Sequence, residues 1–332
     1  MADRPVRAAI AGCGENGIGR GTRAGADLWF THAGAYSRHP RVELVAAADP
    51  SADRRELCRR VWNVDRLYPT VDALLAAERI GVLSVCTPDE THASVALTAI
   101  AAGVPAVFCE KPIASTAADA EHMVTAARQR GAVLAVNHHR RWEAGHREVR
   151  AMIARGDLGR PLAVTVLFAG GFRRVGTHAV DLLRYFFGDG AVVSAATFPD
   201  ESVQARLRFN GGVGATVTAW PKSGSGAYDL FEIDIVATRG RVRVADFGAQ
   251  IHHWPVMPSD EYGGDLELAR QASVVPSDMR SAFVNGVDAV LAAREGAPLA
   301  STGEDALEAV RLLEAIEEAA LATPAATGRI RA

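Results

Sequence analysis

The residues best suited to chemistry in this chain stand in the tripeptide Glu110-Lys111-Pro112. Lys111 is one of only two lysines, the other being Lys222, and the remaining 34 basic residues are arginines. A guanidinium stays protonated at any working pH, whereas the pKa of a partly buried ammonium can fall far enough for it to share or donate a proton. We therefore predict that Lys111 is a catalytic residue at the centre of the active site. A solvated loop lysine is the alternative.

A second candidate pair lies in the segment from Gly176 to Gly188, whose apolar spacing predicts an amphipathic helix. His178 and Asp181 are three residues apart and therefore share one face of this helix. Because the ordinary pKa of histidine lies near working pH and a neighbouring carboxylate can select its tautomer, His178 suits the role of general base. A surface or packed core histidine is the alternative.

Four further histidines are expected to be structural, and no histidine or cysteine spacing supports a metal site, so none is predicted. These histidines are His138, His139, His252 and His253.

A third group of residues predicts dinucleotide binding. The apolar run from Val6 to Ala11 leads into a GxGxxG string that starts with Gly12-Cys13-Gly14 and ends at Gly17. Such glycines let the backbone approach a pyrophosphate, which then lies at the N-terminus of the next helix. Asp49 ends the next apolar run and is placed to bind a ribose, which favours NAD over NADP. It follows Gly14 by 35 residues, where about 20 is usual, so we interpret residues 15–28 as an insertion and leave the role of Gly17 open.

These residues must be positioned by alternating strands and helices. Strands are predicted over 6–11, 42–48, 82–86, 106–109 and 133–137, and helices over 52–62, 72–77, 90–102 and 116–130. Thr116 and Asp119 form a predicted capping box, and Gly131 ends that helix. This alternation predicts a Rossmann-like, doubly wound parallel sheet whose ligand lies at the carboxyl ends of the strands. The residues at those ends are Gly12, Asp49, Thr87, Pro88, Glu110, Lys111 and Asn137.

After Asn137 the pattern changes to segments of period two. Strands are predicted over 162–168, 191–198, 203–209, 214–219, 231–237, 241–245 and 250–254, and helices over 278–293 and 304–323. We therefore predict a dinucleotide-binding domain at 1–137 and an α+β domain at 138–332, built on a mostly antiparallel open sheet, for substrate binding and oligomerisation. Because strands such as 213–220 and 231–237 carry apolar residues on both alternations, a second subunit is expected to cover the outer face, in a homodimer or homotetramer.

Composition narrows the class of protein. Hydrophobic residues make up 48% and charged residues 23% of 332 residues, with a net charge of −3, which is typical of a globular protein. The arginines are spread along the chain, so we predict no nucleic-acid partner. No run approaches membrane-spanning length and no signal-peptide core is present. Four cysteines without CxxC spacing favour a reducing compartment, and we expect a cytoplasmic protein.

These motifs together resemble the Gfo/Idh/MocA family of NAD(P)-dependent oxidoreductases. The resemblance rests on Gly12-Cys13-Gly14, Asp49-Pro50, Thr87-Pro88, Glu110-Lys111-Pro112, His139-Arg140-Arg141 and His178-x-x-Asp181. It implies hydride transfer between nicotinamide and a secondary alcohol or ketone of a sugar, a cyclitol or a nucleotide-linked sugar.

The same resemblance implies a set of functional residues. Lys111 and His178 are the implied catalytic residues, and Arg140, Arg174 and Asp181 the implied substrate-binding residues. The implied cofactor-binding residues are Gly12, Gly14, Asp49, Thr87, Pro88, Glu110 and Lys111.

One position departs from the family pattern. Many members have an aspartate four residues before the histidine, where this chain has Arg174. Two interpretations remain open: an altered proton relay, or an anionic substrate held by Arg173 or Arg174. A non-catalytic NAD-binding sensor, and an enzyme that uses tightly held NAD transiently for elimination or epimerisation, are the alternative functions. Net NADH production from an alcohol would distinguish a dehydrogenase from both.

Overall fold

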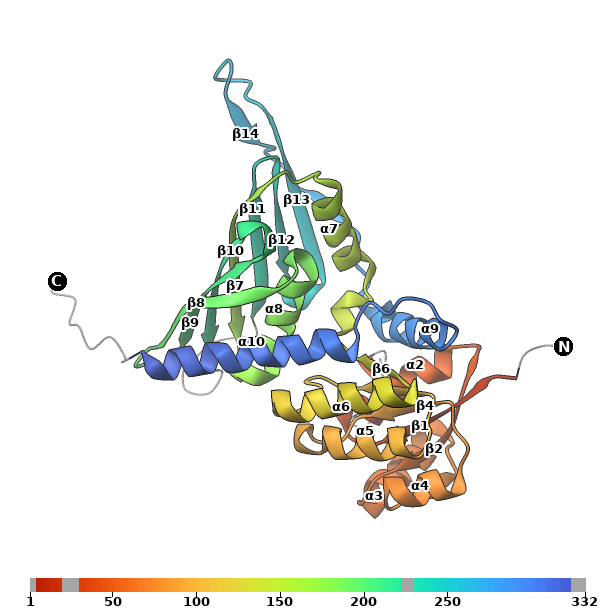
Figure 1. Ribbon diagram of the computed structural model, residues 1–332. Coiled ribbons are helices and arrows are strands. Elements are labelled where there is room, and N and C mark those ends of the chain that lie inside the picture. The colour runs from red at the N-terminus through yellow and green to blue at the C-terminus, as the bar shows by residue number, and fades with distance from the viewer. Residues whose placement is uncertain (1–3, 20–29, 222–229, 324–332) are drawn as a thin grey trace. The chain divides into compact units, whose positions relative to one another are not determined.

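The structure is a computed structural model that describes residues 4–19, 30–221 and 230–323 (Figure 1). Its contacts divide the chain into two compact units. Unit 1 contains residues 1–142 and 280–310, and unit 2 contains residues 143–279 and 311–332. Lys222 and residues 20–28 of the predicted insertion lie outside the described residues.

The described part of unit 1 contains a six-stranded parallel sheet with the order β3-β2-β1-β4-β5-β6. The strands are β1 (Val6–Ala11), β2 (Val42–Ala48), β3 (Arg66–Tyr68), β4 (Val82–Val85), β5 (Ala106–Cys109) and β6 (Val133–Val136). The chain proceeds outward from β1 to β3, and then from β4 to β6 on the other side. Such a sheet has a topological switch point between β1 and β4, where ligands of this fold bind. The predicted doubly wound fold is confirmed.

Helices cover both faces of this sheet. Along β1, Ala8 and Ile10 pack in one apolar cluster, and Ala9 and Ala11 pack in the other. The helices of this unit are α1 (Glu15–Ile18), α2 (His32–Arg38), α3 (Ala52–Trp62), α4 (Val71–Ala77), α5 (His92–Ala101), α6 (Ala117–Arg130) and α9 (Ala282–Arg294). Thr116 caps α6 by accepting a bond from the Asp119 N–H, at 3.1 Å, and Gly131 ends the helix in a left-handed conformation.

The return of residues 280–310 to unit 1 differs from the predicted boundary, which assigns every residue after 137 to the second domain. The physical reason is burial. A parallel sheet must be covered on both faces, and Phe283, Val287 and Leu291 of α9 complete the apolar cluster on one of them. On the other face, Ala306 and Val310 complete the second cluster. Local periodicity predicts a helix here but carries no information about which sheet the helix covers.

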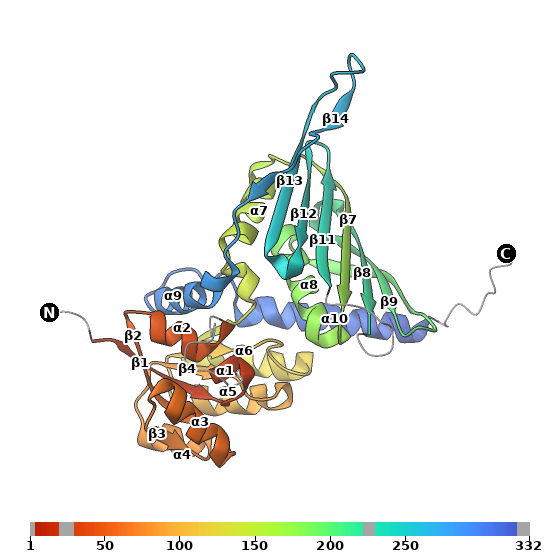
Figure 2. The same ribbon diagram turned by 180° about the vertical axis from the view of Figure 1, so that it is seen from behind.

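Unit 2 is built on a mixed, mostly antiparallel sheet with the order β14-β13-β12-β11-β7-β10-β9-β8, and β15 pairs with β13 (Figure 2). Its strands are β7 (Pro161–Ala169), β8 (Gly190–Thr197), β9 (Val203–Phe209), β10 (Gly214–Trp220), β11 (Phe231–Ala237), β12 (Gly240–Ala245), β13 (Gln250–Pro258), β14 (Leu266–Leu268) and β15 (Ser273–Val275). Only β7 and β10, among the paired strands described in this unit, run parallel. The predicted α+β class is confirmed.

The helices of unit 2 are α7 (Ala144–Arg155), α8 (Phe172–Phe187) and the part of α10 (Gly303–Ala322) that follows residue 310. Alternate residues of β7 (Val164, Val166 and Phe168) are buried. The helix predicted to begin at Gly176 begins four residues earlier, at Phe172. None of the described helices is long and apolar enough to cross a membrane.

The outer face of this sheet is more polar than predicted. On β11, the residues between the buried positions are Glu232, Asp234 and Val236. Asp234 forms an ion pair with Arg241 of β12, and Glu232 forms one with Arg243, at 2.7 Å. Cross-strand ion pairs of this kind satisfy charges on a solvated face. Val236 is the one apolar residue among these three outward positions, so 231–237 offers a second subunit little apolar surface.

Candidate functional site

The turn after β1 requires glycine at two positions. Gly12 has a φ of +94°, and a Cβ there would lie 2.5 Å from the carbonyl oxygen of Cys86. A Cβ on Gly17 would lie 2.2 Å from the carbonyl oxygen of Gly12, which gives Gly17 the packing role that the sequence left open. At Gly14, by contrast, the nearest atom is 4.0 Å away. The backbone is thus tightly folded at Gly12 and open at Gly14, which suits the approach of a pyrophosphate.

Asp49 is held beside this turn. One carboxylate oxygen accepts a hydrogen bond from the Cys13 N–H at 2.7 Å, and the other accepts one from the Ser51 N–H at 2.8 Å. Arg55 donates to the carbonyl oxygens of Asp49 and Pro50, at 2.7 and 3.0 Å. The carboxylate therefore lies next to the glycine turn despite its unusual distance in sequence. This is the position that a ribose-binding acid requires.

Thr87 and Pro88 follow β4, and His92 connects them to the next strand end. The His92 side chain is buried; its Nε2 lies 2.9 Å from the carbonyl oxygen of Thr87 and its Nδ1 lies 2.7 Å from that of Pro112. A histidine at the start of α5 thus links the turn after β4 to the turn after β5. The sequence analysis missed this residue, and its only signal was its position five residues after Thr87.

Glu110 is a buried carboxylate in the turn after β5. It accepts hydrogen bonds from Asn137 at 2.7 Å and from Asn16 at 3.1 Å, and it contacts Nε2 of His32 at 2.9 Å. Burial alone would raise its pKa, but the contacts with His32 and Asn137 and the charge of Lys111 outweigh burial and hold the pKa at about 2. Glu110 is therefore ionised, and it connects the first strand-end turn to the last.

The structure adds residues of α2 to this network. His32 is fully buried, and its Nδ1 lies 2.7 Å from the Ser84 hydroxyl, which lies 2.6 Å from the Tyr36 hydroxyl. Burial raises the pKa of Tyr36 well above its usual range. The sequence analysis did not predict α2. Thr31, which caps it by accepting a bond from the Gly34 N–H at 3.0 Å, was the available signal.

Lys111 is half-buried at the end of the turn after β5, and its peptide bond with Pro112 is cis. Its charge contributes to the low pKa of Glu110, so the ammonium and the carboxylate interact across this turn. The cysteines nearby are not suited to nucleophilic catalysis, because burial raises the pKa of the Cys86 and Cys109 thiols well above the usual range.

The second predicted group lies in unit 2, on α8. His178 is half-buried, and its ring meets that of Phe231 edge to face, with centroids 6.5 Å apart. Asp181 is buried and Arg174 is exposed. Arg173 forms an ion pair with Glu317 of α10, which balances its charge within the unit.

The remaining predicted residues pack against neighbouring side chains, some in unit 1 and some in unit 2. Arg140 is buried in η3 (His139–Arg141), a short 3-10 helix after β6. The His139 ring stacks on Phe283, with centroids 5.8 Å apart. In unit 2, the His252 ring lies 5.9 Å from that of Trp254, and burial lowers the pKa of His253. Over the described ranges, no group of three or more histidine, cysteine or acidic side chains is arranged to hold a metal ion.

Comparison with known proteins finds a family match over the first part of the chain. Residues 7–138 match the model of the GFO_IDH_MocA oxidoreductase family, described as an NAD-binding Rossmann fold. The chain is 28% identical to D-apiose dehydrogenase from Paraburkholderia graminis over 67% of its own length and 66% of that protein's. It is 27% identical to inositol 2-dehydrogenase from Rhizobium meliloti, over 86% and 91%.

A solved structure shows that the same fold continues beyond residue 138. Levoglucosan dehydrogenase, in complex with NADH and L-sorbose, superposes with a TM-score of 0.80 at 17% identity, covering 96% of this chain and 98% of that one. The aligned region spans slightly less than two thirds of the length of the apiose dehydrogenase.

Proposed function

We propose that this chain belongs to the Gfo/Idh/MocA oxidoreductase family and that it is an NAD-dependent dehydrogenase or reductase. Its substrate is a secondary alcohol or ketone of a sugar, a cyclitol or a nucleotide-linked sugar. The observation that carries the proposal is the contact of Asp49 with the Cys13 N–H at the glycine turn, on the same edge of the sheet as Lys111. Ligands of doubly wound sheets bind at this edge.

The residues at this edge fit NAD. Gly12 forms the tight turn and Gly14 leaves room for the pyrophosphate. The Asp49 carboxylate, held beside this turn, would accept hydrogen bonds from the ribose hydroxyls. Thr87, Pro88, Glu110 and Lys111 lie at the adjoining strand ends, where the nicotinamide half of the molecule would lie. When bound, NAD exchanges a hydride with the carbon that bears the substrate hydroxyl.

Protein groups handle the proton of that hydroxyl. His178 accepts it as general base, since its ordinary pKa lies near working pH. Lys111 stabilises the developing alkoxide with its ammonium and tunes the proton transfer. Glu110 acts as a positioning residue for Lys111, because its ionised carboxylate is fixed by Asn137 and Asn16. Arg140, Arg174 and Asp181 bind the other groups of the substrate.

The proposed substrate class is supported by the relatives, which include dehydrogenases of apiose and inositol. We also propose that the protein works as a homodimer or homotetramer. The cytoplasm is its proposed location, and the thiols of Cys13, Cys58, Cys86 and Cys109, all free and buried, fit a reducing compartment.

The test is a screen of inositols, free sugars, glycosides and sugar nucleotides for NAD reduction, and of the matching ketones for NADH oxidation. One substrate that gives stoichiometric NADH would establish the reaction class and its direction together. Loss of that turnover in a His178→Asn variant with unchanged NAD affinity would support the assignment of the base.

Arg174 favours a second candidate function, because it replaces the acid of the usual catalytic group. A non-catalytic NAD-binding sensor would bind NAD and a sugar without net turnover. An enzyme that uses NAD transiently would convert a sugar while the NADH concentration stays constant. Product analysis alongside absorbance at the NADH band distinguishes these outcomes from a dehydrogenase.

A further inference from the structure

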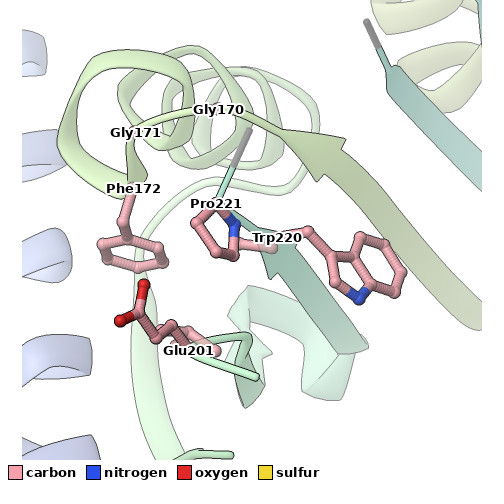
Figure 3. A pocket seen from close by; sticks show the side chains of 8 residues that line it. Gly170, Gly171, Phe172, Glu201, Trp220 and Pro221 are labelled. Carbon is pink, nitrogen blue, oxygen red and sulfur yellow. The ribbon is translucent and has the colours of Figure 1, made fainter. Parts of the chain in front are cut away.

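Unit 2 contains a cavity of about 450 Å³ at the end of its sheet, where β7 leads into α8 (Figure 3). Its volume lies in the range of small-molecule sites. The cavity is formed by the segment after β7, the start of β9 and the end of β10. The residues that line it are Gly170, Gly171, Phe172, Glu201, Val203, Ala219, Trp220 and Pro221.

The lining combines apolar rings with one charged side chain. Figure 3 shows the rings of Phe172 and Pro221 near one another, the Glu201 carboxylate near Phe172, and the Trp220 ring turned away beyond Pro221. Glu201 is the only charged residue among those that line the cavity. The apolar walls suit the carbon face of a ring, and the carboxylate suits hydrogen-bond donors on its edge.

The backbone holds Glu201 in place at some cost. Its φ is +60°, in the left-handed region that favours glycine. The Glu201 N–H donates to the carbonyl oxygen of Phe198 at 2.9 Å, and Asp200 accepts bonds from the Ser202 N–H and hydroxyl at 3.0 and 2.6 Å. A non-glycine residue in this conformation carries a conformational cost. A glycine would remove that cost, so the presence of a carboxylate here points to a use for it.

The cavity lies on the same end of the sheet as His178. The His178 ring contacts Phe231 at the start of β11, and Phe231 pairs with Phe168 of β7. The Phe168 ring in turn lies 6.1 Å from that of Phe172, which lines the cavity.

The separation between His178 and the cavity follows from the sheet and from the helix. β11 and β10 flank β7 on opposite sides, so a group at Phe231 and a group at the end of β10 are about 10 Å apart, two strand spacings. Along α8, the six residues from Phe172 to His178 correspond to a rise of about 9 Å. Both estimates exceed the reach of a single six-membered ring.

We propose that this cavity binds the second, uncharged ring of a glycoside whose first ring presents its carbinol to His178. The inference rests on the proposed function and specifies its substrate class. An anionic group would be repelled by Glu201, whereas ring hydroxyls donate to that carboxylate.

The experiment compares disaccharides with their component sugars on the NAD-loaded protein. Maltose, cellobiose and lactose are tested against glucose and galactose, with kcat/KM from NADH formation and Kd from calorimetry. We expect the best disaccharide to exceed its component sugar at least tenfold in both measurements. Loss of a hydrogen bond to a charged group corresponds to about a tenfold effect or more.

Two variants test the cavity itself. Glu201→Gln and Phe172→Ala should each weaken disaccharide binding and kcat/KM about tenfold and leave the values for the component sugar unchanged. Glu201 is exposed, so Glu201→Gln remains informative if Phe172→Ala fails to fold. Glu261→Gln, another exposed acid of unit 2, is the matched control and should change neither value.

Several results would overturn the inference: disaccharides that bind no more tightly than glucose, or variants that weaken both kinds of sugar equally. The inference would also be overturned if free inositols were turned over and neither variant changed Kd or kcat/KM. The proposed dehydrogenase function would stand in that case. Conversely, disaccharide binding that depends on Glu201, without net NADH formation from any sugar, would support the inference and contradict the proposed function.

Discussion

Lys111 is the residue whose exchange tests the mechanism most directly. Lys111→Arg keeps the positive charge beside Glu110, so NAD affinity measured by calorimetry should stay near that of the wild type. Turnover should fall on the order of 100-fold or more, because arginine does not release its proton and its longer planar group displaces the charge from the reacting hydroxyl. Steady-state kcat on the substrate found in the screen measures this.

The control is Lys222→Arg, which exchanges the only other lysine and should change neither rate nor affinity. Retention of most turnover by Lys111→Arg would contradict the proton role of Lys111. It would then be a positioning charge, and His178 alone would carry the proton chemistry.

Glu110 supports a prediction about pH. Its pKa is about 2 in the folded protein against an ordinary 4.5, and the free carboxylate of the unfolded chain titrates near 4.3. Because the folded pKa is the lower one, the ionised carboxylate stabilises the fold above about pH 4.5, and this contribution is lost as the pH falls toward 2. A shift of this size corresponds to about 3 kcal/mol.

The measurement is urea unfolding of the wild type and of Glu110→Gln between pH 7 and pH 3. The difference in the free energy of unfolding should be constant above pH 5 and should narrow below it. Glu143 has a similarly low pKa, but it is present in both proteins and largely cancels in the difference. A gap that does not depend on pH would show that the charge of Glu110 is not what stabilises the fold.

Asp49 supports a prediction about cofactor choice. Its carboxylate is fixed by two backbone N–H groups and would repel a 2′-phosphate, so NAD should bind at least about tenfold more tightly than NADP. Asp49→Asn retains a carbonyl oxygen and removes the charge. It should therefore raise the affinity for NADP more than the affinity for NAD. Calorimetry with both cofactors is the measurement, and Asp53→Asn on the exposed side of α3 is the control. Equal binding of both cofactors by the wild type would make the half-buried Arg54 or Arg55 the suspected phosphate ligand.

At the scale of the element, α7 depends on one buried cap. Glu143 accepts hydrogen bonds from the N–H groups of Gly145, His146 and Asp278, at 2.9, 2.9 and 2.7 Å, and contacts the His146 ring at 2.6 Å. Glu143→Gln removes the negative charge. It also places a side-chain NH2 group, itself a donor, where the carboxylate accepted bonds from the three N–H groups. We expect unfolding free energy to fall by about 3 kcal/mol.

The comparison variant is Thr116→Ala, which removes the exposed cap of α6 and should cost about 1 kcal/mol. Thermal and urea unfolding of both variants measure the difference. NAD affinity of folded Glu143→Gln should remain unchanged, because Glu143 makes its contacts in unit 2. If Glu143→Gln lowered the free energy of unfolding by less than Thr116→Ala does, water would satisfy the N–H groups of the cap as well as the carboxylate does.

At the scale of the whole molecule, several exposed apolar side chains of unit 2 belong to β13, β14 and β15. The ribbon shows β14 at the protruding end of this sheet (Figures 1 and 2). Leu266 and Val274 are 70% and 67% exposed, and Met257 is 48% exposed. A strand pair that protrudes with apolar side chains usually packs against a partner. Light scattering at micromolar concentration should therefore report a dimer or tetramer.

The double variant Leu266→Asp, Val274→Asp should shift that assembly toward the monomer and leave the melting temperature of the unit nearly unchanged. The ion-paired outer face of β11 and β12 would then be a poor candidate for the main contact. A wild-type protein that is already a monomer would rule out the predicted assembly.

The sequence by itself determined most of the strands, most helices and the residues at the strand ends, but it gave no sign of β3, β14 or β15. Apolar periodicity and glycine or proline positions are local properties, and they locate Gly12, Asp49, Thr87 and Lys111 correctly at the carboxyl edge. Only the tertiary structure decided which distant groups meet there. His32 and His92 contact residues 78 and 20 positions away, and α9 covers a sheet formed by residues before 137. No local sequence pattern encodes such partners. They depend on which apolar surface still has to be covered, and which buried polar atom still needs a hydrogen bond, once the rest of the chain has folded.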